Sequence, residues 1–175
     1  MKVQTLSKEE KLQLQEWIGE GSKTFELLFS IKRDGCDPAT FHRLCDNKGP
    51  TVTVLYNTND SVFGGYTSIE WKSVDSYKED NNAFLFQLRF NGNAKAKRFP
   101  HRNGSKAIYD GKKYGPYFGS GPDLSTFENI VKIDKEYFCL NGKMKSSTYD
   151  MSMCGTGQIN NDHMNVKELE VYQVK

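Results

Sequence analysis

Residues 115–121, GPYFGSG, form the first stretch whose residue types suggest chemistry. Glycines let backbone N–H groups approach an anion such as a phosphate closely. However, no lysine followed by serine or threonine closes the stretch, and no predicted strand leads into it while a helix leads out, as a phosphate-binding loop requires. We therefore interpret the stretch as a turn between strands, in which Gly119 and Gly121 have a structural role.

The histidines and cysteines are candidate bases, nucleophiles and metal ligands. They are His42, His101 and His163, with Cys36, Cys45, Cys139 and Cys154. We expect no histidine to have a partner three or four residues away that completes a metal site or orients a base. The cysteines lack the close pairs of zinc ribbons and redox motifs, so reduced thiols are expected. Asp162 and His163 could approach Cys154, but only the fold decides whether they do. We predict no catalytic residue, metal or cofactor.

A basic segment surrounds Phe99. Its fixed positive charges are Lys95, Lys97, Arg98, Arg102 and Lys106. On a regular strand Lys95 and Lys97 share a face, so the segment could bind an acidic protein surface or follow the phosphates of a nucleic acid. The alternative is an edge strand whose lysines prevent aggregation. We take Lys95, Lys97, Arg98 and Arg102 as candidate partner-binding residues.

Two glutamates near the C-terminus, Glu168 and Glu170, alternate with Leu169 and Val171. Both carboxylates should therefore point to the same side of a strand. Acid–base catalysis would also require a cleft and shifted pKa values. We interpret the pair as part of a solvated face or a partner contact, and count both among the candidate partner-binding residues.

The elements that position these residues are mainly strands. Alternating or β-branched residues predict strands over residues 25–31, 51–56, 61–67, 83–90, 94–99 and 167–174. Helices are predicted over residues 8–18, after a Ser7/Glu10 capping box, and over 38–45, where Pro38 follows a capping Asp37. Residues 141–165 read as a long loop.

Short turns join most of the predicted strands, which favours antiparallel pairing. Gly64 and Gly65 lie inside a predicted strand, where they indicate a bulge or the close packing of another element and so a structural role. The predicted fold is mainly β (α+β), a two-layer antiparallel β-sandwich flanked by two or more short helices.

The composition predicts a folded chain. Of 175 residues, 37% are hydrophobic and 13% aromatic, which argues against intrinsic disorder. Lys and Arg total 24 against 22 Asp and Glu, and a net charge of +2 gives no global attraction to nucleic acid or membrane. We find no long apolar run and no signal peptide, so a cytoplasmic protein is expected. One domain over residues 1–175 is predicted, with 1–20 as an N-terminal helical extension.

Several stretches together resemble the TLDc domain family. The resemblance runs from about residue 20 to the end and rests on TFHRLCD (40–46) with KGPTVTV (48–54), VFGGYTS (62–68), AFLF (83–86), YGPYFGSGPDL (114–124) and ELEVY (168–172). It implies a two-sheet β-sandwich flanked by short helices. It also implies oxidation resistance and association with the vacuolar proton ATPase, without an established active site. The chain is similar, too, to the N-terminal part of interferon-induced 44-like antiviral GTPases.

The leading functional hypothesis is a non-catalytic protein-interaction domain with a protein partner, the vacuolar proton ATPase being the one that the resemblance implies. One alternative is the N-terminal domain of an interferon-induced antiviral GTPase-like protein. Another is a thiol-based redox protein, in which a reactive cysteine would need exposure and a lowered pKa. Nucleic-acid binding through the basic segment, with Phe99 and Tyr109, is the least favoured of these hypotheses. The sequence leaves the oligomeric state open.

Overall fold

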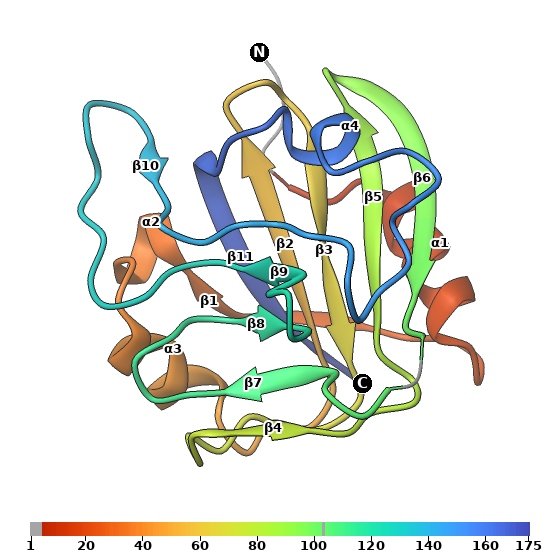
Figure 1. Cartoon of the computed structure of the whole chain (residues 1–175), viewed down its shortest axis with the longest axis horizontal. Helices are drawn as coiled ribbons and strands as arrows, with labels where there is room; N and C mark the ends of the chain where they lie inside the picture. The colour runs from red at the N-terminus through yellow and green to blue at the C-terminus, as the bar shows by residue number, and fades with distance from the viewer. Residues whose placement is uncertain (1–4, 103) are drawn as a thin grey trace.

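Two antiparallel sheets pack face to face in the computed structural model, which describes residues 5–102 and 104–175 (Figure 1). Among these residues the larger sheet has seven strands, in the order β1-β11-β2-β3-β5-β6, and β10 also pairs with β11. They are β1 (Phe25–Ser30), β2 (Thr51–Asn57), β3 (Val62–Thr67), β5 (Phe84–Phe90), β6 (Asn93–Pro100), β10 (Phe138–Cys139) and β11 (Asn165–Val174).

The smaller sheet lies in front of the larger one in Figure 1. Its order is β4-β7-β8-β9, and its strands are β4 (Ser76–Lys78), β7 (Ile108–Asp110), β8 (Tyr117–Phe118) and β9 (Leu124–Ser125). Short helices surround the two sheets: α1 (Lys8–Ile18), α2 (Ile31–Asp34), α3 (Pro38–Cys45) and α4 (Gly157–Asn160). The predicted mainly β, two-layer antiparallel fold with short helices is confirmed.

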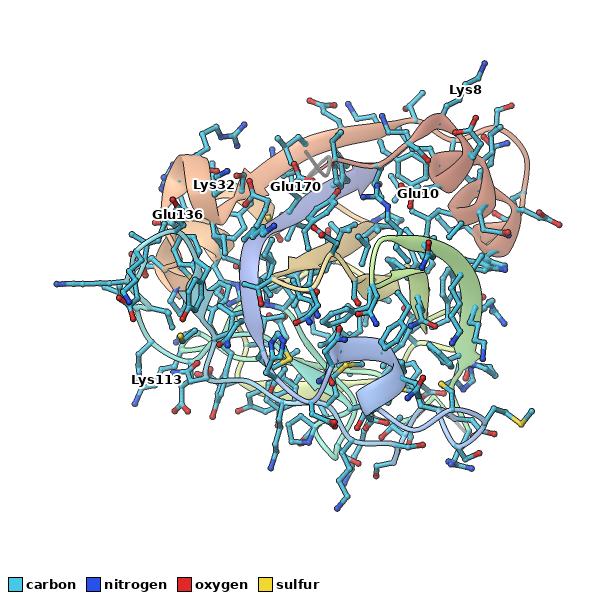
Figure 2. The ribbon with its side chains drawn as sticks, turned by 90° about the horizontal axis from the view of Figure 1, so that it is seen from above. Lys8, Glu10, Lys32, Lys113, Glu136 and Glu170 are labelled. Atoms are coloured by element: carbon cyan, nitrogen blue, oxygen red, sulfur yellow. The ribbon has the colours of Figure 1, made fainter. Side chains whose placement is uncertain are left out.

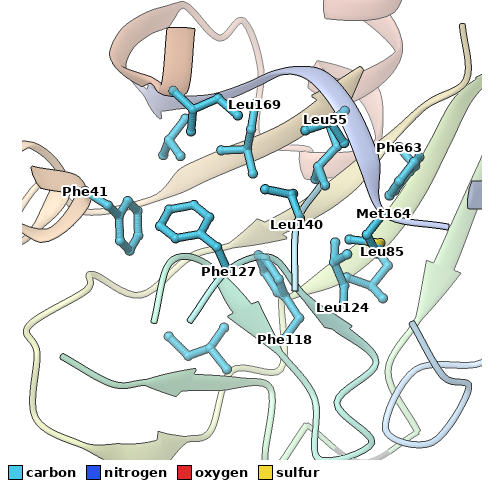
Figure 3. Close-up of a cluster of buried hydrophobic side chains, with 14 of the residues drawn as sticks. Phe41, Leu55, Phe63, Leu85, Phe118, Leu124, Phe127, Leu140, Met164 and Leu169 are labelled. Carbon is cyan, nitrogen blue, oxygen red and sulfur yellow. The ribbon is translucent and has the colours of Figure 1, made fainter. Parts of the chain in front are cut away.

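The main core lies between the two sheets, because the inward residues of both are apolar. Figure 3 shows Leu55, Phe63, Leu85 and Leu169 of the larger sheet facing Phe118 and Leu124 of the smaller one, with Phe127 and Leu140 from connecting segments. Of the two glycines of β3, Gly65 faces this core and Gly64 faces the outer side of the sheet, towards Phe86. A Cβ on Gly64 would overlap the backbone carbonyl of Thr53, and one on Gly65 would lie 2.8 Å from the ring of Phe118. Both positions therefore need glycine.

Helix α1 covers the opposite, outer face of the larger sheet. Its predicted bounds and capping box are confirmed: Glu10 N donates to Ser7 Oγ over 3.1 Å, and Ser7 N donates to Glu10 Oε1 over 2.8 Å. Leu14 is fully buried, and the ring of Trp17 meets that of Phe84 edge-on at 6.1 Å between centroids. Residues 1–4 of the predicted extension lie outside the described residues.

An ion pair fastens α1 to the sheet. The Arg89 guanidinium of β5 donates to both carboxylate oxygens of Glu10, over 2.7 and 2.6 Å. Burial alone would raise the pKa of Glu10, but the bonds from Arg89 and from Ser7 N outweigh it and hold the pKa below 4.5. Figure 2 shows Glu10 between α1 and the sheet, while Lys8 is directed away from it.

Each of the six predicted strands differs from the observed one by one or two residues at one end or both, and the predicted loop was wrong as well. The first strand ends at Ser30 rather than residue 31, because the Ser30 side chain accepts from Arg33 N over 3.2 Å and caps the one-turn helix α2. The predicted loop over residues 141–165 contains α4, and β11 already begins at Asn165, where it pairs with Cys139 of β10. Nothing in the short segments before β11 had the periodicity that predicts a helix or a strand.

Candidate functional site

Strand β6 carries the core of the basic segment at an edge of the larger sheet. Asn91 and Gly92 have φ values of 51° and 83°, the left-handed pair that a tight hairpin between β5 and β6 requires. Within the described residues, β6 has a strand neighbour on one side only, namely β5. On the other side, the backbone bonds of the described chain reach β6 at its end, where Asp150 N donates to the carbonyl of Pro100 over 2.8 Å. No other described segment therefore covers the backbone edge of β6 before Pro100.

A register shift interrupts the alternation along β6. Gln87 lies opposite Lys97 and Arg89 opposite Ala94, so β6 holds one extra residue between these pairs. Lys95 lies over the ring of Phe90, at 5.2 Å from its centroid, and Arg98 lies over the ring of Phe84, at 4.7 Å. The regular alternation that places Lys95 and Lys97 on one face is thus broken.

The cations of β6 differ from most charged side chains in having no acidic partner among the residues that the structure describes. Lys95, Lys97 and Arg98 form no ion pair within the described residues. The other members of the basic segment lie elsewhere: Arg102 pairs with Asp150 at 3.5 Å, and Lys106 lies over the ring of Tyr77. The candidate interface is therefore the positive edge formed by Lys95, Lys97 and Arg98, which we call the basic edge, with Arg102 at its far end.

Glu168 and Glu170 are not part of a solvated face, contrary to the prediction. Their exposed fractions are only 7% and 8%, because β11 lies between β1 and β2 rather than at an edge. Glu168 accepts from Ser30 Oγ over 2.8 Å and from Lys32 N over 3.2 Å, which ties β11 to α2. Burial raises the pKa of Glu168 above 4.5, against the opposing effect of these bonds. Figure 2 shows Glu170 on the side of the sheet that α1 covers.

His42 has a partner four residues on, so that prediction was also wrong. Its Nδ1 lies 2.7 Å from Oδ1 of Asp46, the residue that caps the end of α3. Its Nε2 faces two backbone carbonyls, of Gly111 at 2.8 Å and of Tyr114 at 3.0 Å. Both nitrogens of the buried ring are therefore engaged by oxygen atoms of the protein.

This histidine joins a cluster that resembles a metal site. Ligand atoms of His42, Asp46 and Asp110 lie within 4.8 Å of one another. Both ring nitrogens of His42 are already engaged, however, and Asp110 already accepts from Lys78 Nζ over 2.8 Å and from the backbone of Ser73 over 2.9 Å. The arrangement instead links α3 to the smaller sheet.

The glycine-rich stretch turns its backbone amides inward. Gly121 N donates to Oδ1 of the fully buried Asp123 over 3.2 Å, and Ser120 N donates to Thr148 Oγ1 over 3.0 Å. Gly119 has a φ of 78°, and a Cβ there would overlap the Asp123 carboxylate. The protein's own carboxylate thus occupies the place that an anion would take.

The cysteines differ in their surroundings. Cys36 and Cys45 are buried, Cys154 is half-buried and Cys139 is exposed, and all are free thiols. Burial raises the pKa of Cys36 to about 12 and also raises that of Cys45, so neither forms a nucleophilic thiolate at neutral pH. His163 contacts Asn59 at 2.6 Å through Nε2 and accepts from Asn165 N through Nδ1, so both of its ring nitrogens are already engaged.

Two surfaces had no counterpart in the sequence predictions. A groove of about 680 Å³ runs beside the exposed Ile130 and Ile133, between α2 and the segment before β10. On the smaller sheet, the rings of Tyr77, Tyr109 and Tyr117 lie together with Tyr114. The closely spaced tyrosines at 109, 114 and 117 were a visible signal, but only the pairing of β4 with β7 brings Tyr77 beside them.

None of the described helices is long and apolar enough to cross a membrane.

Comparison with known proteins supports one family. The family model described as the TLDc domain matches residues 2–175. The MTOR-associated protein MEAK7 of chicken (Gallus gallus) is 39% identical over 67 residues, 37% of this chain and 14% of that protein. MEAK7 of zebrafish (Danio rerio) is 34% identical over 70 residues (38% and 15%), and human MEAK7 is 37% identical over 65 residues (35% and 14%). These matches thus cover only 14 to 15% of the relatives' own length. Because the family model spans almost the whole chain, the protein belongs to the TLDc domain family.

Proposed function

We propose that this chain acts as one non-catalytic docking domain, and that its basic edge binds an acidic surface of a protein partner. The observation that carries the proposal is the set of cations on β6 that have no acidic partner among the described residues, beside an open backbone edge. Unpaired charges gathered on one edge steer and select a partner of opposite charge.

The family supports a proposal for the nature of the partner. The matched relatives are named as MTOR-associated proteins, and we extend to this chain the association with a protein assembly rather than the identity of that assembly. Our finer proposal, from the TLDc resemblance, is that the assembly is the vacuolar proton ATPase, that the domain binds its cytoplasmic side, and that this contact underlies oxidation resistance. The raised pKa values of Cys36 and Cys45 speak against a thiol-based mechanism at those two sites.

Binding to isolated vacuolar membranes tests the proposal. The purified domain is co-sedimented with membranes that contain the proton pump, and ATP-driven acidification is recorded in parallel. The variant Lys95→Glu/Lys97→Glu/Arg98→Glu should bind at least about tenfold more weakly than wild type, and raised salt should weaken wild-type binding in the same direction.

The matched control changes the net charge by the same amount elsewhere. Lys132→Glu/Lys135→Glu/Lys145→Glu alters exposed lysines outside β6 and should bind like wild type. Equal recovery of the wild type and of both triple variants would show that the basic edge does not bind the partner. Absence of binding by the wild-type domain would reject the proton ATPase as its partner.

A further inference from the structure

Four tyrosines form a cluster on the outer face of the smaller sheet, which we call the tyrosine cluster: Tyr77 of β4, Tyr109 of β7, Tyr117 of β8 and Tyr114 before β8. The ring centroids of Tyr77 and Tyr109 lie 4.9 Å apart, those of Tyr109 and Tyr117 5.3 Å, and those of Tyr114 and Tyr117 5.2 Å. The core residues of the same strands, Ile108 and Phe118, point the opposite way. The tyrosines are therefore additional to the core.

The tyrosine cluster is open to solvent. Tyr77 is 38% exposed and the other three rings are half-buried, mostly against one another. Tyr114 and Tyr117 also line a groove of about 280 Å³ together with Pro122 and Lys143. Tyrosine combines a large apolar ring with a hydroxyl that hydrogen-bonds, which explains why it is enriched where proteins bind partners.

Lysines surround the tyrosine cluster. Lys106 Nζ lies 5.4 Å from the centroid of the Tyr77 ring, Lys143 lines the groove, and Lys113 precedes Tyr114. Within the part of the chain that the structure describes, none of these three lysines forms an ion pair. One carboxylate, that of Glu128, lines the same groove. Figure 2 shows Lys113 on the side of the molecule opposite Lys8 of α1.

The angles between the rings indicate which ligand fits. Neighbouring rings meet at 54° to 88°, so the surface is ridged rather than flat. Nucleic-acid bases need free ring faces on which to stack, but Lys106 already lies over a face of Tyr77 and the other rings abut each other. Ridges of aromatic rings suit the polyproline II helix, whose prolines fit between them at a small entropic cost because that helix is preformed.

We propose that the tyrosine cluster binds an extended, proline-containing acidic segment of a partner protein. The prolines pack between the rings, the tyrosine hydroxyls donate to the segment's free carbonyls, and Lys106, Lys113 and Lys143 pair with its carboxylates. This surface is on the smaller sheet and the basic edge is on the larger one, so the inference stands apart from the proposed function.

A synthetic peptide of alternating prolines and glutamates is the probe. Titration followed by amide NMR should shift signals of β4, β7 and β8, with calorimetry giving the dissociation constant. Tyr77→Ala and, separately, Lys106→Glu/Lys143→Glu should each weaken binding about tenfold. Tyr117→Phe keeps the ring packing and removes only a hydroxyl, so it should bind measurably more weakly than wild type while folding normally.

Control variants and a control peptide distinguish this proposal from the alternatives. Ile130→Ala/Ile133→Ala changes another exposed surface and should bind the peptide like wild type. A peptide with glycine in place of proline should bind at least about tenfold more weakly. The proposal is wrong if the proline peptide fails to bind, if the glycine peptide binds equally well, or if the tyrosine and lysine variants bind like wild type. Tighter binding of oligothymidylate at the same signals, or loss of self-association in Tyr77→Ala without any peptide binding, would also overturn it.

Discussion

Strands β6 and β11 both alternate charged with apolar residues, yet they hold their charges in opposite surroundings. The cations of β6 are exposed or half-buried, and among the described strands β6 pairs with β5 alone. The carboxylates of Glu168 and Glu170 in β11 are buried, with β1 and β2 on either side. Alternation shows that a strand has two different faces. It does not show how many neighbours the strand has, or what covers its polar face.

The difference also assigns roles to the charges. In β11 the Glu168 carboxylate accepts from Ser30 and Lys32, so it holds α2 against the sheet. In β6 the ammonium groups of Lys95 and Lys97 bond to nothing within the described residues, apart from the cation–π contact of Lys95 with Phe90. Charges in the centre of the sheet are therefore structural, and those at its edge are free for recognition or for protection against aggregation.

The largest effect should come from filling the space at a central strand. Gly64→Ala places a methyl group against the backbone carbonyl of Thr53, which cannot move without breaking the pairing of β2 with β3. We expect a loss of about 3 kcal/mol in the free energy of unfolding, measured by urea denaturation. Ala96→Val adds more atoms at an exposed site in β6 and should change stability by no more than about 0.5 kcal/mol. Similar losses for the two variants would erase the distinction between centre and edge.

Removing a buried carboxylate should have the next largest effect. Glu168→Ala leaves Ser30 Oγ and Lys32 N without their acceptor in a buried place, at a cost of about 2 kcal/mol. Lys97→Ala removes an edge charge that has no bonded partner in the described part of the chain, and it should cost no more than about 0.5 kcal/mol. Thermal or urea unfolding of the two variants side by side gives the comparison. A fully stable Glu168→Ala protein would show that α2 does not depend on this contact.

The pH dependence should distinguish the buried Glu168 from the half-buried Glu10 by the sign of its slope. Because burial raises the pKa of folded Glu168 above 4.5, the native state binds its proton more tightly than the unfolded chain does, and this contribution to stability is lost as pH rises from 4.5 through the folded pKa. Glu168→Gln should therefore gain stability relative to wild type between about pH 4 and pH 7. Glu10 has a lowered pKa, so its contribution is present above pH 4.5 and is lost as pH falls through the folded value.

Glu10→Gln serves as the control with the opposite slope. It should lose about 1 kcal/mol at neutral pH, through the weakened bonds to Arg89, and the loss should shrink as the pH falls. Urea midpoints at several pH values give both slopes. Parallel slopes for the two variants would contradict the assigned environments.

The bounds of helices and strands could be predicted from the sequence better than which elements pack beside one another. The capping box of Ser7 and Glu10 gave the bounds of α1, and the alternation of Phe84 and Phe86 gave β5, because both signals are local. The burial of Glu168 depends on β1 and α2 lying beside β11, a contact across more than one hundred residues. The contact between His42 and Asp46 was not predicted, although their four-residue spacing is visible in the sequence. The ring is also held by the carbonyls of Gly111 and Tyr114, which are distant in the sequence and only the fold brings to it.

Substitutions of Lys95 and Lys97 should change stability least, but they distinguish two roles of the basic edge. Lys95→Gln/Lys97→Gln removes two edge charges, and Lys95→Glu/Lys97→Glu reverses them; both should unfold within about 0.5 kcal/mol of wild type. If the lysines only guard the edge, the glutamate variant stays monodisperse and keeps its partner, because either sign of charge blocks edge-to-edge pairing. If they also bind an acidic surface, the glutamate variant stays monodisperse but loses the partner. Light scattering and membrane co-sedimentation on the same samples separate these outcomes, because aggregation reports on charge alone and binding reports on its sign.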